Sequence, residues 1–168
     1  MLRQMIKIET NVIKNSLFTN IENLIVHPKF NYSMNCNTEI VNFYHTLYYD
    51  NNILSPFAHV INPVIDFLKM KVSNAMIVVV PKTNEKKPIF KKIEKPLEIM
   101  DTITCVYFIN TNNGNFNLFN FDDIDAEQNK IFMYDSNLEV TNFTCTDKKF
   151  KAYLQLEFFK DSDNMNDL

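Results

Sequence analysis

The chain has 168 residues, 46% of them hydrophobic and 13% aromatic, with a formal net charge of −3 and a pI of about 5.6. A chain of this length and hydrophobicity can bury its own core, which predicts one folded domain and excludes a disordered chain. The slight acidity gives no reason to expect binding to nucleic acid or to an anionic membrane.

The cysteines and the first residues indicate an intracellular type of protein. Cys36, Cys105 and Cys145 are widely spaced and form no C-x-x-C pair, so we expect free thiols rather than a disulfide framework. The opening fifteen residues lack the apolar core of a signal peptide, and no apolar run reaches membrane-spanning length. We therefore expect no secretion by a signal peptide and no membrane partner.

The region from about residue 16 to residue 70 has helical signals. Ser16 is a candidate N-cap for a helix whose apolar residues recur at helical spacing. Ser55 and Pro56 suit the start of a second helix, and Pro63 predicts a kink or a restart within it. The only histidines are His27, His45 and His59. No two have the spacing of metal ligands, so we expect ordinary helix or loop histidines.

The second half of the chain has strand signals. Runs rich in β-branched and aromatic residues occupy 75–80, 102–110, 115–120, 130–135 and 150–159. Helices followed by evenly spaced strands predict two packed antiparallel sheets with the helices outside. We expect a single domain over residues 1–160, with its sheet strands at about 75–159, and a polar acidic tail at 161–168. That tail is either a flexible end or a segment ordered by a partner.

The single glycine of the chain, Gly114, follows Asn113 between two strand-like runs. An Asn-Gly pair in this setting predicts a hairpin turn in which both residues take positive φ angles.

Several segments together resemble the Fe(II)- and 2-oxoglutarate-dependent dioxygenases, above all the small phage and viral members related to prolyl hydroxylases. The resemblance covers roughly residues 20 to 159. It is carried by these segments: FYHTLYYDNNILSPFAHVINPVIDFLKMK, VVPKTNEKKPIF, VYFINTNNGNFNLF and NKIFMYDSNLEVTNFTCTDKKFKAYLQLEFF. The resemblance implies a double-stranded β-helix, also called a jelly roll, with helices buttressing one sheet.

The resemblance also implies positions for the family's iron ligands and for its 2-oxoglutarate-binding base. The H-x-D pair of the family falls on Lys92 and Glu94, and the second histidine falls on Val140. The basic residue that binds the far carboxylate of 2-oxoglutarate falls on Lys151, where arginine is usual. A protonated lysine and a valine cannot bind iron, and no histidine follows residue 59. We therefore expect a lost iron site and no cofactor.

Two interpretations of Lys92 and Glu94 remain. They could form a new acid–base pair, or the ammonium could fill the space of the lost cation and neutralise the carboxylate. The surrounding basic run over residues 82–95 predicts a solvated loop, with contact to an acidic partner or phosphate as the alternative.

The function expected from these observations is non-catalytic. Asparagine is the commonest residue and Arg3 is the only arginine, a bias typical of an AT-rich genome. Together with the resemblance, this predicts a viral or phage protein in the virus particle or the cytoplasm of the infected host. Its partners would be proteins, including other virion subunits or copies of itself. The alternatives are an active or remodelled oxygenase and a pseudoenzyme that still binds 2-oxoglutarate or a peptide.

Overall fold

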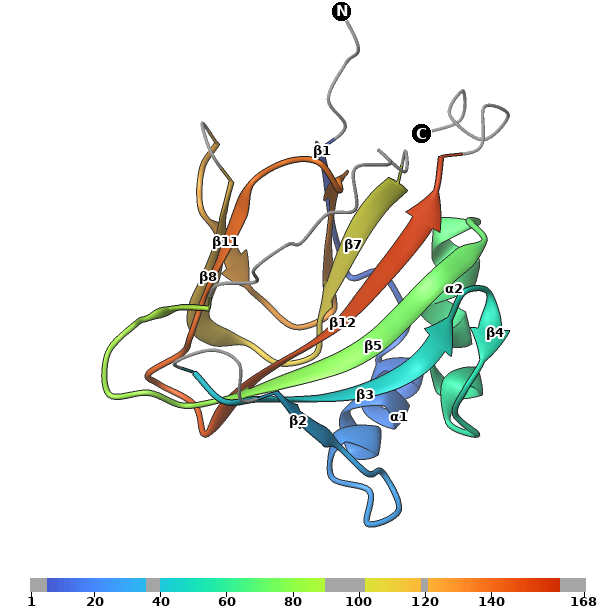
Figure 1. The fold of residues 1–168 in the computed structure, drawn as a ribbon, viewed down its shortest axis with the longest axis horizontal. Helices are drawn as coiled ribbons and strands as arrows, with labels where there is room; N and C mark the ends of the chain where they lie inside the picture. The colour runs from blue at the N-terminus through green and yellow to red at the C-terminus, as the bar shows by residue number, and fades with distance from the viewer. Residues whose placement is uncertain (1–5, 36–39, 90–101, 119–120, 161–168) are drawn as a thin grey trace, which may run out of the picture.

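The computed structural model describes residues 6–35, 40–89, 102–118 and 121–160, and it has two β-sheets with helices on one side (Figure 1). The larger sheet contains β1 (Ile6–Thr10), β2 (Ser33–Asn35), β3 (Asn42–Tyr49), β4 (Asn52–Ile53), β5 (Val72–Pro81), β7 (Thr102–Phe108), β10 (Lys130–Asp135) and β12 (Phe150–Phe159). Its order is β1-β10-β7-β12-β5-β3-β2, with β4 beside β3. The smaller sheet contains β6 (Pro88–Ile89), β8 (Asn112–Leu118), β9 (Ile124–Ala126) and β11 (Val140–Phe143), in the order β6-β11-β8-β9. This mainly β architecture with external helices confirms the predicted fold class.

The helices cover the outer face of the larger sheet. They are α1 (Asn15–Ile25), the 3-10 helix η1 (Ala58–Ile61) and α2 (Asn62–Leu68). Pro63 lies in the first turn of α2, which confirms the predicted restart. Helix α1 begins one residue before Ser16, and its N-cap Lys14 makes no side-chain capping bond. No helix in the described ranges is long and apolar enough to cross a membrane.

Two hydrophobic cores lie on opposite faces of the larger sheet. The outer core packs Phe18, Ile21 and Leu24 of α1 against strand residues such as Leu154. The second core, which we call the inter-sheet core, lies between the two sheets. Its buried members are Ile40, Val78, Val80, Ile89, Val106, Phe108, Phe116, Leu118, Ile124, Ala126, Phe132 and Tyr153. Because side chains alternate along a strand, β12 contributes to both cores.

The first part of the chain contains more strand than the sequence predicted. Strands β1 to β4 all lie before residue 54, and β3 falls inside the segment expected to be helical. Strand β3 has one fully buried residue, Leu47, while most of its other side chains are half-buried. Its sequence, NFYHTLYY, therefore lacks the clean alternation by which a strand is recognised.

The predicted Asn113-Gly114 turn is wrong. Both residues lie within β8, and no glycine has a positive φ angle. The connection between β7 and β8 comes earlier, at residues 109–111. Positive φ angles occur at Asn11, Asp50, Asn51, Lys69 and Asn129 instead. Asparagine tolerates this conformation better than most residues with a side chain, so in this chain it takes over much of the usual role of glycine.

Asn129 shows how such a residue is used. Its side chain accepts hydrogen bonds from the backbone N–H of Ile13 and the hydroxyl of Tyr107, and it donates one to the carbonyl of Ile13. Asn129 is buried and has a φ of 58°. It therefore ties the segment that follows β1 to the end of β7 and the start of β10.

We expect Asn129→Ala to lower the free energy of unfolding by about 2 kcal/mol, because buried partners lose their hydrogen bonds. Urea denaturation checks this. Asn51→Ala is the matched control, since Asn51 also has a positive φ but is exposed. Equal losses in the two variants would show that backbone strain, rather than the buried hydrogen bonds, decides the effect.

Candidate functional site

Lys151 is the most unusual residue between the two sheets. It is the second residue of β12, and its side chain is completely buried. It pairs with Val80 of β5 and projects, like Tyr153, toward the smaller sheet. A fully buried lysine is rare unless its charge is matched by its surroundings.

A cage of acceptors surrounds the ammonium group of Lys151. Its Nζ donates to the side-chain Oδ1 of Asn142 at 2.6 Å, to the carbonyl of Phe143 at 3.1 Å and to the carbonyl of Asn115 at 3.2 Å. It also lies 4.1 Å from the ring centre of Phe116, over the ring face. A lysine ammonium has three N–H donors, so these three bonds use all of them. Lys151 thus joins the larger sheet to β8 and β11 of the smaller one.

The other partners of the cage are fixed by hydrogen bonds of their own. The amide nitrogen of Asn142 donates to the hydroxyl of Tyr153 at 3.0 Å, which turns its oxygen toward Lys151. Burial raises the pKa of Tyr153, and burial lowers the pKa of Lys151 to about 7. The cation–π contact and the short bond to Asn142 favour the charged form and oppose this shift.

Gly114 lies directly beside the side chain of Lys151. A Cβ atom on Gly114 would meet the carbonyl oxygen of Phe143 at 2.9 Å, the Oδ1 of Asn112 at 2.9 Å and the Cδ of Lys151 at 3.0 Å. The glycine is therefore required by close approach and not by its φ angle. In this way the only glycine of the chain leaves room for its buried lysine.

Asn113 fastens β8 to the loop that leads into β12. Its backbone N–H donates to Asp147, its side-chain amide donates to the hydroxyl of Thr146, and its Oδ1 accepts the N–H of Thr146. Asn113 and Gly114, which were predicted to form a turn, thus lie within β8, where Asn113 holds the loop before β12 and Gly114 leaves room for Lys151.

The four positions implied by the family resemblance differ in what the structure shows. Val140 begins β11 and packs, half-buried, against the inter-sheet core. Lys151, the second residue of β12, reaches the same core from the opposite sheet. Lys92 and Glu94 lie outside the described residues. The assignment of Lys151 to 2-oxoglutarate binding stays a prediction.

The three histidines lie away from the inter-sheet core. His45 packs on Phe30 and bonds Ser55 at 2.8 Å, and His59 bonds the carbonyl of Pro56 at 2.8 Å. His27 makes an edge contact with the ring of Phe57. Phe30 and Phe57 belong to the outer core, so these imidazoles lie on the helical side of the larger sheet.

Comparison with known proteins supports the fold. No family model matches the sequence, and no curated protein matches it. Among solved structures, the prolyl hydroxylase of Trichoplax adhaerens in complex with a hypoxia-inducible-factor peptide matches with a TM-score of 0.69 and 12% identity, covering 97% of this chain and 87% of that one. HygX of Streptomyces hygroscopicus, with nickel and 2-oxoglutarate bound, gives 0.64 and 7%, covering 95% and 84%. A 2OG-Fe(II) oxygenase family oxidoreductase of Burkholderia pseudomallei gives 0.64 and 7%, covering 92% and 84%.

The chain has the fold of the 2OG-Fe(II) oxygenases. At these identities the likeness shows the fold alone, so the chemistry must be judged from the residues of this chain.

The described residues offer no imidazole to this site. The position that the resemblance implies for the second histidine is Val140, and the three histidines lie on the far side of the larger sheet. Within the described ranges, no group of three His, Cys, Asp or Glu side chains could hold a metal ion. The described part of the chain therefore does not bring together the two histidines and one carboxylate of such a centre.

Sequence reasoning missed the cage itself. Asn115 lay at the start of a predicted strand and Asn142 lay outside all of the predicted strands, and neither was a candidate site residue. Tyr153 was the available signal, because it is an aromatic residue on the same strand face as Lys151, Gln155 and Glu157, which indicates that this face of β12 is also covered.

Proposed function

We propose that this chain is a protein-interaction module built on an oxygenase fold that has lost its chemistry, and that it acts in a virus particle or an infected host cell. One observation carries the proposal: Lys151, which the resemblance places at the 2-oxoglutarate-binding position, uses all three donors on acceptors of its own chain. A dicarboxylate would have to displace the bonds that connect the two sheets.

The chemistry of the ligand positions supports the same conclusion. Val140 supplies a branched hydrocarbon where the family has an imidazole, and no histidine follows residue 59. A viral setting is supported by the AT-rich codon bias and by the resemblance to phage and viral members. An interaction role is supported by the exposed loops of the chain, such as residues 84–87, because the fold alone does not decide function.

Iron binding and turnover test the proposal. The chain is reconstituted anaerobically with Fe(II), desalted and analysed for metal, and succinate release from 2-oxoglutarate is measured beside an active prolyl hydroxylase. We expect neither bound iron nor succinate above background. Stoichiometric iron together with succinate release would overturn the proposal.

A second experiment tests the assignment of the lost ligand positions. The triple variant Lys92→His, Glu94→Asp, Val140→His should gain affinity for Co(II) or Zn(II), because it restores two imidazoles and one carboxylate. Visible absorption of bound Co(II) measures the gain, and Val140→His alone is the control. A triple variant that folds like the parent but binds no metal would show that these positions are wrongly assigned.

A further inference from the structure

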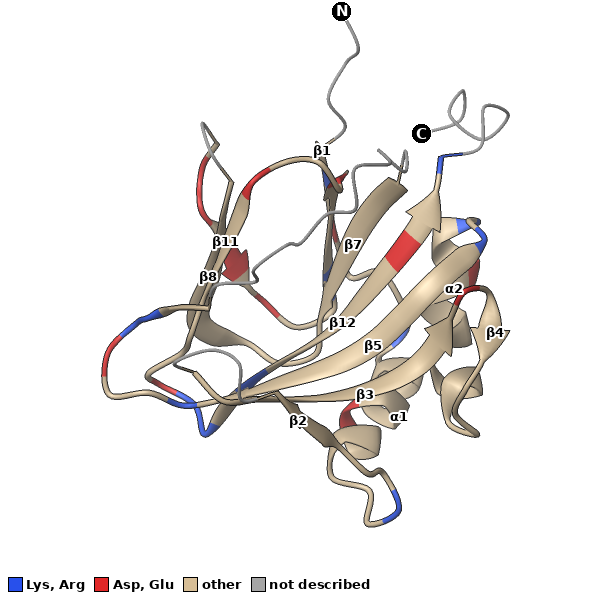
Figure 2. Cartoon of the chain, in the orientation of Figure 1, with Lys and Arg blue, Asp and Glu red and all other residues tan. Residues whose placement is uncertain are grey.

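Lysines are concentrated at one end of the two sheets. The loop between β5 and β6 carries Lys82, Lys86 and Lys87, and the loop between β11 and β12 carries Lys148 and Lys149. All five are exposed, and Figure 2 shows the two loops together at one end of the molecule. We call residues 82–87 and 144–149 the basic tip. The basic tip contains five lysines and only two acidic residues, Glu85 and Asp147, although the net charge of the whole chain is −3.

The two loops of the basic tip form one fixed unit. The N–H of Thr83 donates to the carbonyl of Cys145, and the N–H of Lys82 donates to the carbonyl of Lys149. The hydroxyls of Thr83 and Thr144 lie 2.6 Å apart, and the Thr144 hydroxyl also accepts the N–H of Lys87. The lysines are thus carried on a backbone that is already ordered, which lowers the entropy lost on binding.

The acidic residues of the tip are already engaged. Glu85 forms an ion pair with Lys87 at 3.5 Å, and Asp147 accepts the N–H of Asn113. In the part of the chain that the structure describes, the other four lysines of the tip form no ion pair. The surface therefore presents uncompensated positive charge.

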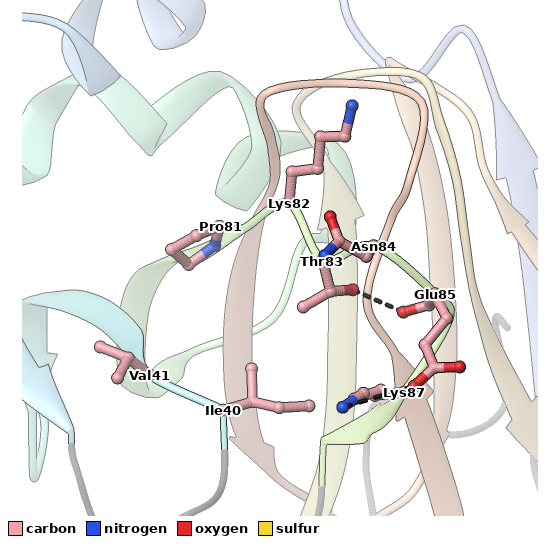
Figure 3. A pocket seen from close by; sticks show the side chains of 8 residues that line it. All are labelled: Ile40, Val41, Pro81, Lys82, Thr83, Asn84, Glu85 and Lys87. Atoms are coloured by element: carbon pink, nitrogen blue, oxygen red, sulfur yellow. Dashed lines mark hydrogen bonds and ion pairs between the residues drawn. The ribbon is translucent and has the colours of Figure 1, made fainter.

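A pocket of about 430 Å³ lies beside these lysines. Figure 3 shows Val41 and Pro81 on one side, Glu85 and Lys87 on the other, and Ile40 between them. An apolar floor with a charged rim suits a short acidic segment that carries one apolar side chain.

The chain itself contains such a segment. Residues 161–168, DSDNMNDL, include three aspartates and no basic residue, together with Met165 and Leu168. Their charge is opposite to that of the basic tip, and either apolar side chain matches the floor of the pocket.

The geometry favours the tail of a second molecule over the tail of the same one. Strand β12 starts beside the basic tip and ends at Phe159, at the opposite end of the sheet (Figure 1). Lys160 is held by an ion pair with Asp135. From Lys160 back to the start of β12 is about 33 Å, whereas the eight residues that follow it reach at most about 29 Å when extended. The tail of one molecule is too short to return along β12 and enter its own pocket.

We propose that the basic tip binds residues 161–168 of a second copy of this chain. The contact is head-to-tail, so an open assembly has a free tip at one end and a free tail at the other. It therefore grows as a chain or closes as a ring. This inference deepens the interaction role proposed above by naming the partner, and it does not depend on the state of the iron site.

Sedimentation velocity and a tail peptide test the proposal. At low ionic strength the full chain should sediment faster as its concentration rises, and deletion of residues 161–168 should abolish this increase. A fluorescent peptide of residues 160–168 should bind the deleted chain, and Lys148→Glu with Lys149→Glu should weaken its binding about tenfold. Lys29→Glu with Lys71→Glu is the matched control, because it reverses two exposed lysines outside the tip.

Two further experiments test whether the segment bound by the basic tip is residues 161–168. A variant with Asp163→Lys and Asp167→Lys should associate with the charge-reversed tip, and a peptide with Met165→Ser and Leu168→Ser should bind less tightly than the natural one. A chain that stays monomeric at all concentrations overturns the proposal. Self-association that survives tail deletion, or a tip that binds other acidic peptides but not this tail, overturns it as well.

Discussion

Gly114→Val should lower the free energy of unfolding by at least about 3 kcal/mol, the largest effect expected from any single substitution in this site. Even a single Cβ would stand 2.9 Å from the carbonyl oxygen of Phe143. That oxygen belongs to the backbone of β11 and accepts a hydrogen bond from Lys151. It cannot move away without separating β11 from β8 or breaking the cage.

Thermal and urea denaturation of graded variants measure this effect. Gly114→Ala should destabilise less than Gly114→Val, because alanine adds only the Cβ, whereas valine adds two further methyl groups to a space in which the Cβ already meets three close atoms. Thr141→Val is the control, because threonine and valine have nearly the same shape and residue 141 lies in the neighbouring strand β11. It should leave the free energy of unfolding within about 0.5 kcal/mol of the parent. If Gly114→Val melted at the temperature of the parent, the close contact described for Gly114 would be wrong.

The stability of the protein should rise with pH above 7 because of Lys151. Burial lowers the folded pKa of Lys151 from 10.5 to about 7. Between these values the unfolded chain holds a proton that the folded chain has released. Stability then increases by up to about 1.4 kcal/mol for each pH unit, or about 5 kcal/mol over the whole interval. Below pH 7 both states are protonated, and the dependence disappears.

Urea denaturation of the parent and of Lys151→Met between pH 7 and about 8.5 measures this slope. The upper limit avoids the ionisation of tyrosines in the unfolded chain, and the partial ionisation of its thiols near pH 8.5 is the same in the parent and in the lysine variants. Lys151→Met should lose the slope, whereas Lys71→Met, at an exposed lysine, should keep it. Identical slopes in the parent and in Lys151→Met would mean that the acceptor cage keeps the ammonium charged throughout this range.

The sequence predicted the longer elements, in which strand-forming residues or helix-start signals extend over several positions. Strand β10 and strand β12 occupy the predicted ranges, and the restart at Pro63 is present. Strands β9 and β11 were missed because they contain only three and four residues. Too few side chains alternate in such strands to give a periodic signal.

The sequence pointed to Lys151 as a candidate residue but not to its surroundings. The resemblance placed Lys151 on the last strand, and the structure buries it there. The acceptors around it come from Asn115, Asn142 and Phe143, which are brought to it by sheet pairing and not by sequence spacing. Gly114 was assigned to a turn because Asn-Gly pairs usually form turns. In the structure, glycine is required at this position because a Cβ would collide with neighbouring atoms, including the side chain of Lys151.

The use of asparagine at left-handed positions also has a consequence for the unfolded protein. Glycine gives an unfolded chain many more backbone conformations than any other residue, and each replacement at a compatible site stabilises the native state by about 0.4–1 kcal/mol through the unfolded state. A chain with one glycine in 168 residues therefore starts from a more restricted unfolded ensemble. Part of the stability of this protein thus arises before any native contact has formed.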